Sequence, residues 1–282
     1  MVTFYYGPGI APPPLPPQFT TPPVHLPASE EDILSFARRL DFHPDPLQAQ
    51  VLRSTAKRGI LNCTRQWGKS TLMALKAVHR AFTRPDSLVL VACPTARQSG
   101  EWMKKARAFL LRLGLSPRSD GSNPISLALP NGSRIVGLPG ANSEARVRGF
   151  SSVSLLLIDE AARLDDSLYK ALRPMVAVAN GEIWMMSTPF GKRGFFYDTW
   201  TISERESAES WTRLEVRALD CPRISREFLE EERTILGSAW FDQEYQCRFI
   251  DNGSSIFSRE LVEAALDDTI EPLDLPPWPL AA

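Results

Sequence analysis

Residues 63–70, Cys-Thr-Arg-Gln-Trp-Gly-Lys-Ser, contain the residue types that bind a phosphate chain. Gly68 lets the backbone approach phosphate oxygens without a clash at Cβ, Lys69 can reach the β- and γ-phosphates, and the Ser70 hydroxyl can ligate Mg²⁺. Because a helix is expected to begin here, its unpaired amides also face the anion. Cys63 stands where the first glycine of the P-loop pattern is usual. The segment predicts a phosphate-binding loop with one departure from the pattern.

Asp159 and Glu160 supply the second half of such a site. They follow the apolar run Leu155 to Ile158, which is typical of a buried strand. Ligands of open α/β sheets bind at the carboxyl ends of the strands, so both carboxylates are expected at the binding edge. Asp159 can hold Mg²⁺ through water, and Glu160 can polarise the attacking water. The alternative interpretation is a strand end followed by two solvated acids.

The elements that must position these residues alternate along the chain. Short apolar, β-branched runs predict buried strands, and the stretches between them predict helices. Asn131-Gly132 predicts a hairpin because both residues tolerate positive φ, and Ser29 is the predicted N-cap of the first helix. The alternation predicts an α/β fold with a largely parallel sheet. The expected strands are 60–63, 87–92, 125–129, 134–138, 153–158, 183–187 and 213–216, and the expected helices are 30–40, 69–82 and 96–113.

Composition narrows the class of protein. The chain has 282 residues, 43% of them apolar, which is enough for one domain with a large core. Lys and Arg total 32 against 33 Asp and Glu, so the net charge gives no general case for nucleic-acid binding. The four cysteines include no C-x-x-C pair, which argues against a zinc site or a disulfide scaffold. The scattered cysteines indicate reduced thiols and so a cytoplasmic protein. No apolar run approaches the length of a membrane span, so we expect no membrane partner.

Both ends of the chain are rich in proline. Proline fixes φ and donates no backbone hydrogen bond, so residues 1–28 are expected to form a disordered tail, or else a docking segment for a partner. The folded domain is expected over residues 29–250. Residues 251–282 are expected to form a loose linker and tail.

Several motifs resemble those of viral terminase large subunits, and they occur in that family's order. The likeness spans about residues 40–250, and the combination is more specific than any single motif. In chain order the motifs are Pro46-Leu-Gln48 (an adenine-side glutamine motif), residues 63–71 (a degenerate Walker A), Cys93-Pro-Thr95 with Gln98 (a strand-to-helix motif shared with helicases), Asp159-Glu-Ala-Ala162 (Walker B), Ser187-Thr-Pro189 with Gly191 (a coupling motif) and residues 240–249 (the end of the ATPase region).

The resemblance implies a three-layer P-loop NTPase fold of the additional-strand (ASCE) type, with a mostly parallel central sheet and a small β-hairpin insertion. It implies an ATP hydrolase that uses ATP and Mg²⁺, in which Lys69 and Glu160 act in catalysis and Ser70 and Asp159 hold the metal. Gln48 would recognise adenine, or else be a surface glutamine at a helix start. The residues expected to contact the nucleotide are Gln48, Arg65, Gln66, Trp67, Gly68, Lys69, Ser70, Thr71, Ser187 and Thr188.

Arg148 lies just before the Walker B strand, where the resemblance places an arginine finger, and Arg146 is the close alternative. An arginine finger neutralises charge on the γ-phosphoryl oxygens and increases the rate by about 10³–10⁵-fold. If the finger acts in trans, the working form is a ring of identical subunits. The other interpretation is a solvated loop arginine. Ser187 and Thr188 would sense hydrolysis, unless they only end a strand before Pro189.

The resemblance also implies a motor that moves double-stranded DNA into a capsid, with the terminase small subunit and the portal protein as partners. The alternatives are a helicase-like P-loop ATPase with another role, and a truncated remnant that binds nucleotide or a partner without turnover. About thirty residues follow Phe249, which leaves no room for the family's nuclease domain. We therefore expect no nuclease activity in this chain, which would be a fragment, a split-gene product or a decayed prophage copy.

A group of basic residues falls on the helix expected over residues 96–113. It could follow a DNA backbone, in which case binding would fall steeply with salt. The alternative is a solvated helix face. Trp102 and Phe109 of the same helix are expected in the core. The basic residues are Arg97, Lys104, Lys105, Arg107 and Arg112.

Overall fold

The computed structural model describes residues 31–119, 121, 125–140, 149–202, 210–251 and 265. The predicted tail of residues 1–28, most of residues 251–282 and the loop that carries Arg146 and Arg148 lie outside the described residues.

The predicted alternation of strands and helices is confirmed, and the strand bounds differ from the expected ones by at most two residues. The strands are β1 (Arg58–Cys63), β2 (Leu88–Cys93), β3 (Ser126–Ala128), β4 (Arg134–Pro139), β5 (Val153–Asp159), β6 (Glu182–Ser187) and β7 (Thr212–Val216). The α-helices are α1 (Ile33–Arg39), α2 (Pro46–Arg53), α3 (Lys69–Thr83), α4 (Ala96–Arg112), α6 (Asp166–Leu172), α7 (Gly194–Thr201), α8 (Arg226–Leu236) and α9 (Ser238–Tyr245). Short 3-10 helices are η1 (Ala161–Arg163), η2 (Arg173–Val176) and η3 (Ala218–Asp220).

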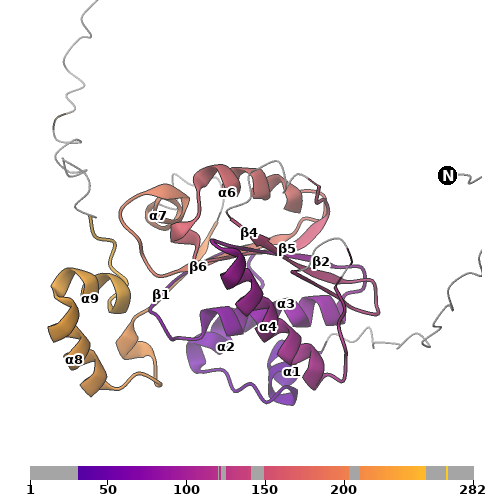
Figure 1. Cartoon of the computed structure of the whole chain (residues 1–282), viewed down its shortest axis with the longest axis horizontal. Helices are drawn as coiled ribbons and strands as arrows, with labels where there is room; N and C mark the ends of the chain where they lie inside the picture. Colours follow the sequence, from indigo (N-terminus) through magenta and orange to yellow (C-terminus); the bar gives the residue numbers. More distant parts are fainter. Residues whose placement is uncertain are drawn as a thin grey trace, which may run out of the picture.

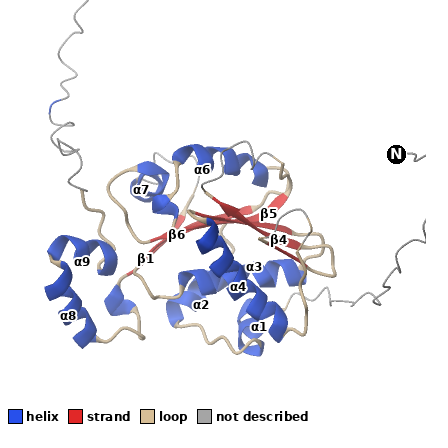
Figure 2. Cartoon of the chain, viewed as in Figure 1, coloured by secondary structure: helices blue, strands red, loops and turns tan. Residues whose placement is uncertain are grey.

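The strands form one sheet in the order β3-β4-β2-β5-β6-β1-β7. Strand β3 is antiparallel to β4, and the other pairings in this sheet are parallel. Helices α1 to α4 cover one face of the sheet and α6 and α7 cover the other, while α8 and α9 stand beside it (Figure 1, Figure 2). The predicted three-layer α/β fold with a mostly parallel sheet is confirmed.

Each central strand contributes to two cores because successive side chains point to opposite faces of the sheet. On β2, Val89 and Val91 pack with the layer of α1 to α4, whereas Leu90 and Ala92 pack with the layer of α6 and α7. Burial on both faces explains why this strand reads in the sequence as a continuous apolar run.

Strand β6 lies between β1 and β5, which is the additional-strand arrangement that the resemblance implied. The three strands are parallel, with Asn62 beside Ser187 and Asp159 beside Met186. Their carboxyl ends therefore reach the same edge of the sheet. That edge is where open α/β sheets bind ligands.

Asn131 and Gly132 turn the hairpin between β3 and β4, as predicted. Gly132 has a φ of 83°, and the Leu129 amide donates to the Ser133 carbonyl at 2.9 Å. The Asn131 side chain has a second function, because its Nδ2 donates to the Ala81 carbonyl near the end of α3 at 2.8 Å. The hairpin is thus attached to the helix that follows the phosphate-binding loop.

Helix α1 is shorter than expected, and the prediction that Ser29 is its N-cap was wrong. Asp32 caps the helix, because its carboxylate accepts from the Ser35 amide at 3.1 Å. A carboxylate is a favourable N-cap because it satisfies a free amide and complements the positive end of the helix dipole.

A buried ion cluster joins α3 to the start of β6. Lys76 and Arg80 of α3 both pair with Glu182, and Lys76 Nζ lies 3.7 Å from Glu182 Oε2. Arg80 also donates to the Ser154 carbonyl at 2.9 Å. Burial lowers the pKa of Lys76, although the Glu182 carboxylate opposes this shift. One carboxylate therefore balances two cations that have little access to water.

Replacing this carboxylate should destabilise the fold. We expect Glu182→Gln to lower the free energy of unfolding by about 3 kcal/mol, because both cations lose their counter-charge while they stay buried. Urea unfolding of the full chain measures this loss. The matched control is the exposed pair of Lys104 and Glu101 on α4, whose charged atoms lie 2.7 Å apart. Glu101→Gln should have a far smaller effect, and equal losses in both variants would contradict the role of the cluster.

Candidate functional site

The predicted phosphate-binding loop connects β1 to α3. Cys63 is still the last residue of β1, and its thiol packs in the core, where burial raises its pKa. Because this backbone is extended, the position needs no glycine, which explains the departure from the P-loop pattern. The Thr64 amide then donates to the Val216 carbonyl of β7 at 2.8 Å. The loop that can wrap a ligand therefore comprises residues 64–68.

Gly68 ends this loop in a conformation that favours glycine. Its φ is 90°, and it is the N-cap of α3. A Cβ at this position would lie 3.3 Å from Gln48 Nε2. Gln66 also has a positive φ, of 62°. These two residues turn the chain sharply, so that α3 begins directly beside the loop and its free amides are available to an anion.

Trp67 anchors the loop. Its side chain is fully buried in the core between the sheet and α1 to α4, so only its backbone is available to a ligand. The Trp67 carbonyl accepts from Gln48 Nε2 at 2.9 Å and from the Arg223 guanidinium. Two side chains from distant segments therefore hold the middle of the loop.

Gln48 has both ends of its amide engaged. Its Oε1 accepts from the Asp45 amide at 3.1 Å in the capping box of α2, and its Nε2 donates to Trp67. The residue is 3% exposed, so the alternative of a surface glutamine is wrong. Its recognition of adenine stays a prediction, and it would require the amide to exchange these partners.

Lys69 is the first residue of α3 and lies close to the carboxylates that end β5. Its Nζ is 3.2 Å from Glu160 Oε1. Burial opposes the charged form of Lys69, but the Glu160 and Asp159 carboxylates together outweigh it and raise the pKa. The amine therefore stays charged inside the protein.

Asp159 and Ser70 line the same part of the cleft, and the Ser70 hydroxyl favours the charged form of the Asp159 carboxyl and so opposes a rise in its pKa. The Glu160 amide donates to Asp159 Oδ1 at 3.0 Å. Burial and the neighbouring Glu160 carboxylate raise the pKa of Asp159. A bound dication would offset the cost of this buried charge, and a hydroxyl with a carboxylate is an oxygen ligand set that suits Mg²⁺. The two residues therefore fit the predicted metal site.

These residues line one cleft. Its larger part has a volume of about 500 Å³ and its adjoining part about 210 Å³, within the usual range for ligand sites. The larger part is lined by Arg65, Gln66, Gly68, Lys69, Ser70, Thr71, Gln98, Lys105, Glu160 and Arg163. The adjoining part is lined by Ser70, Cys93, Pro94, Arg97, Gln98, Glu101, Trp102, Lys105, Asp159 and Glu160. Most of the predicted loop and carboxylate residues thus come together, while Ser187 and Thr188 are buried and do not line the cleft.

Three charged residues near the cleft were not singled out by the sequence. Arg223 contacts the loop at Trp67 and lies 3.3 Å from Asp45. Arg163 lines the cleft directly after the Walker B residues. Glu244 of α9 accepts from Arg65 Nε at 2.6 Å. For Glu244 the only signal was its place in the segment that resembles the end of the ATPase region.

The basic residues of α4 do not share one environment. Lys105 and Arg97 line the cleft. Lys104 pairs with Glu101, and Arg112 donates to the Leu40 carbonyl. The helix therefore spreads its charges over the cleft, an exposed ion pair and an interhelical contact. Trp102 and Phe109 lie in the core, as predicted.

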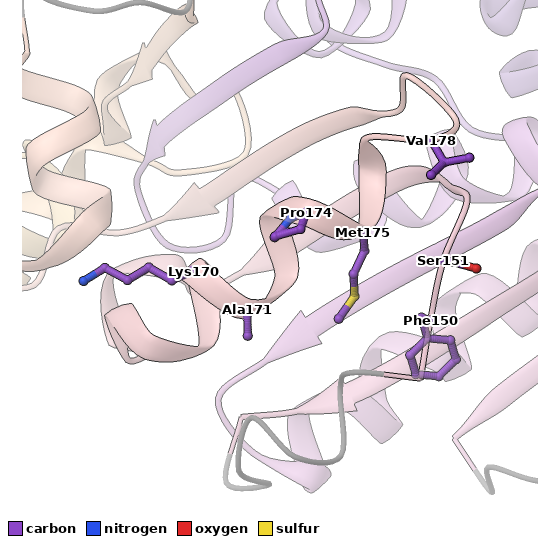
Figure 3. Close-up of a pocket in the computed structure, with 7 residues that line it drawn as sticks. All are labelled: Phe150, Ser151, Lys170, Ala171, Pro174, Met175 and Val178. Carbon is purple, nitrogen blue, oxygen red and sulfur yellow. The ribbon is translucent and has the colours of Figure 1, made fainter.

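A second cavity, of about 590 Å³, lies away from the phosphate-binding loop (Figure 3). Figure 3 shows one wall on the stretch before β5 and the other on the helical stretch from α6 through η2. It contains one charged residue and no paired carboxylates, so it offers none of the chemistry of the first cleft. It is lined by Phe150, Ser151, Lys170, Ala171, Pro174, Met175 and Val178.

Comparison with known proteins identifies the family. A family model described as terminase large subunit, T4likevirus-type, N-terminal, matches residues 60–264, which is more than half of the chain. The chain belongs to the terminase large subunit family. The terminase large subunit of Thermus virus P23-45 is 26% identical over 253 residues, a match that covers 79% of this chain and 52% of that protein. This terminase chain therefore spans about half the length of the curated relatives it matches.

Solved terminase structures share the fold. The large terminase ATPase domain of Thermus Phage P74-26 has a TM-score of 0.66 at 23% identity, covering 77% of this chain and 98% of that one. A large terminase from a thermophilic bacteriophage, solved in complex with ADP, has a TM-score of 0.59 at 14% identity, covering 78% and 52%. None of the helices described in this terminase chain combines the length and the apolarity needed to cross a bilayer.

Two glycine substitutions should change stability in opposite directions. Gly68→Ala should lower the free energy of unfolding by about 1–2 kcal/mol, because an L side chain is strained at this φ. Gly100 lies inside α4, and a Cβ at this position would have no heavy atom within 4 Å outside its own stretch of helix. Gly100→Ala should raise the free energy by about 0.5–1 kcal/mol, because alanine loses less backbone entropy in a helix. Urea unfolding measures both, and a change of the same sign in both would contradict the loop geometry.

Proposed function

We propose that this terminase chain hydrolyses ATP with Mg²⁺, and that hydrolysis drives double-stranded DNA into a capsid. The observation that carries the ATPase proposal is the meeting of Lys69 and Ser70 with Asp159 and Glu160 around one cleft. These four residues cover the needs of phosphoryl transfer: phosphate binding, metal binding and orientation of water. The large terminase of a thermophilic bacteriophage forms a complex with ADP, which supports an adenine nucleotide as the ligand here.

Nucleotide binding requires Lys69 to change partners. Its ammonium now pairs with Glu160, whereas a triphosphate would offer it the more highly charged β- and γ-phosphate oxygens. The Glu160 carboxylate would then be free to accept a hydrogen bond from the attacking water and to hold it in line with the γ-phosphorus. Binding of ATP would therefore release Glu160 from Lys69 and make it available as the base.

The remaining loop residues bind the phosphate chain. The backbone amides of residues 66–71 at the start of α3 provide fixed donors for the phosphate oxygens. Arg65 is 57% exposed and lines the cleft, so its terminal nitrogens can reach a phosphate while its Nε stays on Glu244. Ser70 and Asp159 would hold Mg²⁺, which neutralises charge on the β- and γ-phosphates when it is bound.

Further parts of the motor are proposed from the family resemblance. Arg148, with Arg146 as the alternative, would complete the site of a neighbouring subunit in a ring. Gln48 would recognise adenine, and Ser187 and Thr188 would sense hydrolysis. The proposed partners are double-stranded DNA, the terminase small subunit and the portal protein, in the cytoplasm of the host cell.

Two substitutions separate binding from turnover. Lys69→Ala should lower kcat at least about 100-fold, because the charge on the phosphates loses its buried cation. Glu160→Gln should lower kcat about 10²–10⁴-fold while binding persists, because only the base is removed. A phosphate-release assay measures turnover, and calorimetry with a non-hydrolysable ATP analogue measures binding.

The control for these variants is Lys170→Ala, which removes an exposed lysine of α6 on the other side of the sheet. It should turn over ATP like the wild type. The ATPase proposal fails if Lys69→Ala also keeps wild-type turnover. Binding of the analogue without any turnover in the wild type would instead support the nucleotide-binding remnant.

The motor proposal makes a separate prediction about stimulation. Addition of double-stranded DNA with the terminase small subunit or the portal protein should increase ATP turnover, because these partners engage the motor during packaging. Single-stranded DNA should have a smaller effect. Stronger stimulation by single strands would support the helicase-like ATPase and contradict the packaging motor.

A further inference from the structure

Arg163 stands beside the proposed base, Glu160. It is the last residue of η1, and its side chain is 24% exposed. Glu160 is the N-cap of η1, and residues three apart in a 3-10 turn eclipse each other, so the two side chains lie on one face. Arg163 Nη1 donates to Glu160 Oε2 at 3.4 Å. The local turn therefore brings a cation to the side of the Glu160 carboxylate.

The same nitrogen of Arg163 reaches the segment after β6. Nη1 donates to Thr188 Oγ1 at 3.2 Å, and the guanidinium lies 4.5 Å from the centroid of the Phe190 ring. Thr188 is buried, so this contact is fixed rather than solvent-exposed. An arginine suits this place because its planar group offers several donors and also stacks on an aromatic ring. Arg163 thus connects the ends of two neighbouring strands.

Glu244 pairs with the other terminal nitrogen of Arg163, Nη2. Its Oε1 lies 3.6 Å from Arg163 Nη2, and its Oε2 accepts from Arg65 Nε. The Glu244 side chain is 5% exposed, so its charge must be balanced inside the protein. The Thr64 hydroxyl donates to the Glu244 carbonyl at 3.0 Å, which attaches this end of α9 to the phosphate-binding loop. Glu244 therefore fixes the direction in which both arginines point.

The distances indicate orientation of Glu160 rather than neutralisation. A strong charge-assisted hydrogen bond between nitrogen and oxygen spans about 2.7–2.9 Å, and the Arg163 contact to Glu160 is longer. Glu244 and Thr188 share the guanidinium, so it does not close on Glu160 as a tight ion pair. Once nucleotide releases Lys69 from Glu160, the carboxylate would keep acceptor capacity for water, while the Arg163 contact to Oε2 would limit its orientation.

We propose that Arg163 is a positioning residue that sets the orientation of Glu160 relative to Thr188, and that Glu244 of α9 holds it in place. The proposal rests on the proposed ATPase function, because its effect on turnover passes through Glu160. It predicts that Arg163 affects the chemical step and not the affinity for nucleotide.

The first test compares kcat with KM in the full chain. Arg163→Gln should lower kcat roughly 10- to 100-fold, as expected for a partner that orients a reacting group. The KM for ATP and the affinity for a non-hydrolysable analogue should stay within about twofold of the wild-type values, since Arg163 is not expected to contribute to binding of the ground-state nucleotide. A rise in KM with unchanged kcat would overturn the proposal, because Arg163 would then bind the phosphates directly.

The second test asks whether Arg163 acts through Glu160. In the Glu160→Gln background, Arg163→Gln should cause no further loss of the residual turnover, because the group that it orients is already absent. A further loss as large as in the wild-type background would show an independent role and overturn the proposal.

Two more variants guard against a purely structural explanation. Arg163→Lys keeps the charge but loses the planar group, so it should recover part of kcat without recovering all of it. Arg248→Gln is the matched control, since it removes an exposed arginine that pairs with Asp242 of α9. It should keep wild-type kcat. A loss in Arg248→Gln equal to that in Arg163→Gln would overturn the proposal.

A last measurement judges the network without any turnover. The decreases in melting temperature caused by Arg163→Gln and Glu244→Gln should be less than additive in the double variant, because both remove the same contact. Full additivity would overturn the pairing. Failure of the ATPase proposal shows differently, as equal turnover in the wild type and Lys69→Ala, and leaves this thermal comparison valid.

Discussion

The attraction between the buried Lys69 ammonium and the carboxylates that end β5 is the interaction on which the site depends. A buried cation is costly unless an anion lies nearby, and Glu160 stands 3.2 Å away. Both residues are held by regular elements, since Lys69 begins α3 and Glu160 directly follows β5. The parallel pairing of β5, β6 and β1 sets their separation, and Gly68 sets where α3 begins. In the proposed function, a triphosphate would replace Glu160 as the anion that pairs with Lys69.

The chain after β7 completes this arrangement from the side. Helix α9 provides Glu244 to both arginines near the cleft, and the Cys247 carbonyl accepts from Asn62 Nδ2 of β1 at 2.9 Å. Arg223, just before α8, holds the loop carbonyl of Trp67. The α8–α9 unit has only a small core of its own, so these polar contacts define its position beside the sheet. A change in charge within the cleft would therefore act directly on Glu244 of α9 through its contacts with Arg65 and Arg163.

Membership of the terminase large subunit family agrees with this geometry, but the roles of the individual site residues must be argued from their own contacts. At 23% identity or below, the solved terminases share the fold, and a fold alone does not determine a site. The departures are local and have physical reasons. Cys63 replaces a glycine because the strand still continues there, and Trp67 occupies a loop position as a core anchor rather than as a ligand-facing group.

The sequence by itself determined the strands, the hairpin and the two halves of the site, because each depends on neighbours within a few residues. An apolar run before Asp159, the Asn131-Gly132 turn and the Gly-Lys-Ser segment carry their own geometry. Tertiary structure alone decided which distant groups meet. Arg65 and Glu244 lie 179 residues apart, and Gln48 contacts a loop 19 residues away. Asp32 rather than Ser29 caps α1, because the helix begins at Ile33 and the Asp32 carboxylate accepts from the Ser35 amide. The long-range pairs have no local signal, because they exist only once the sheet has brought their elements to one edge.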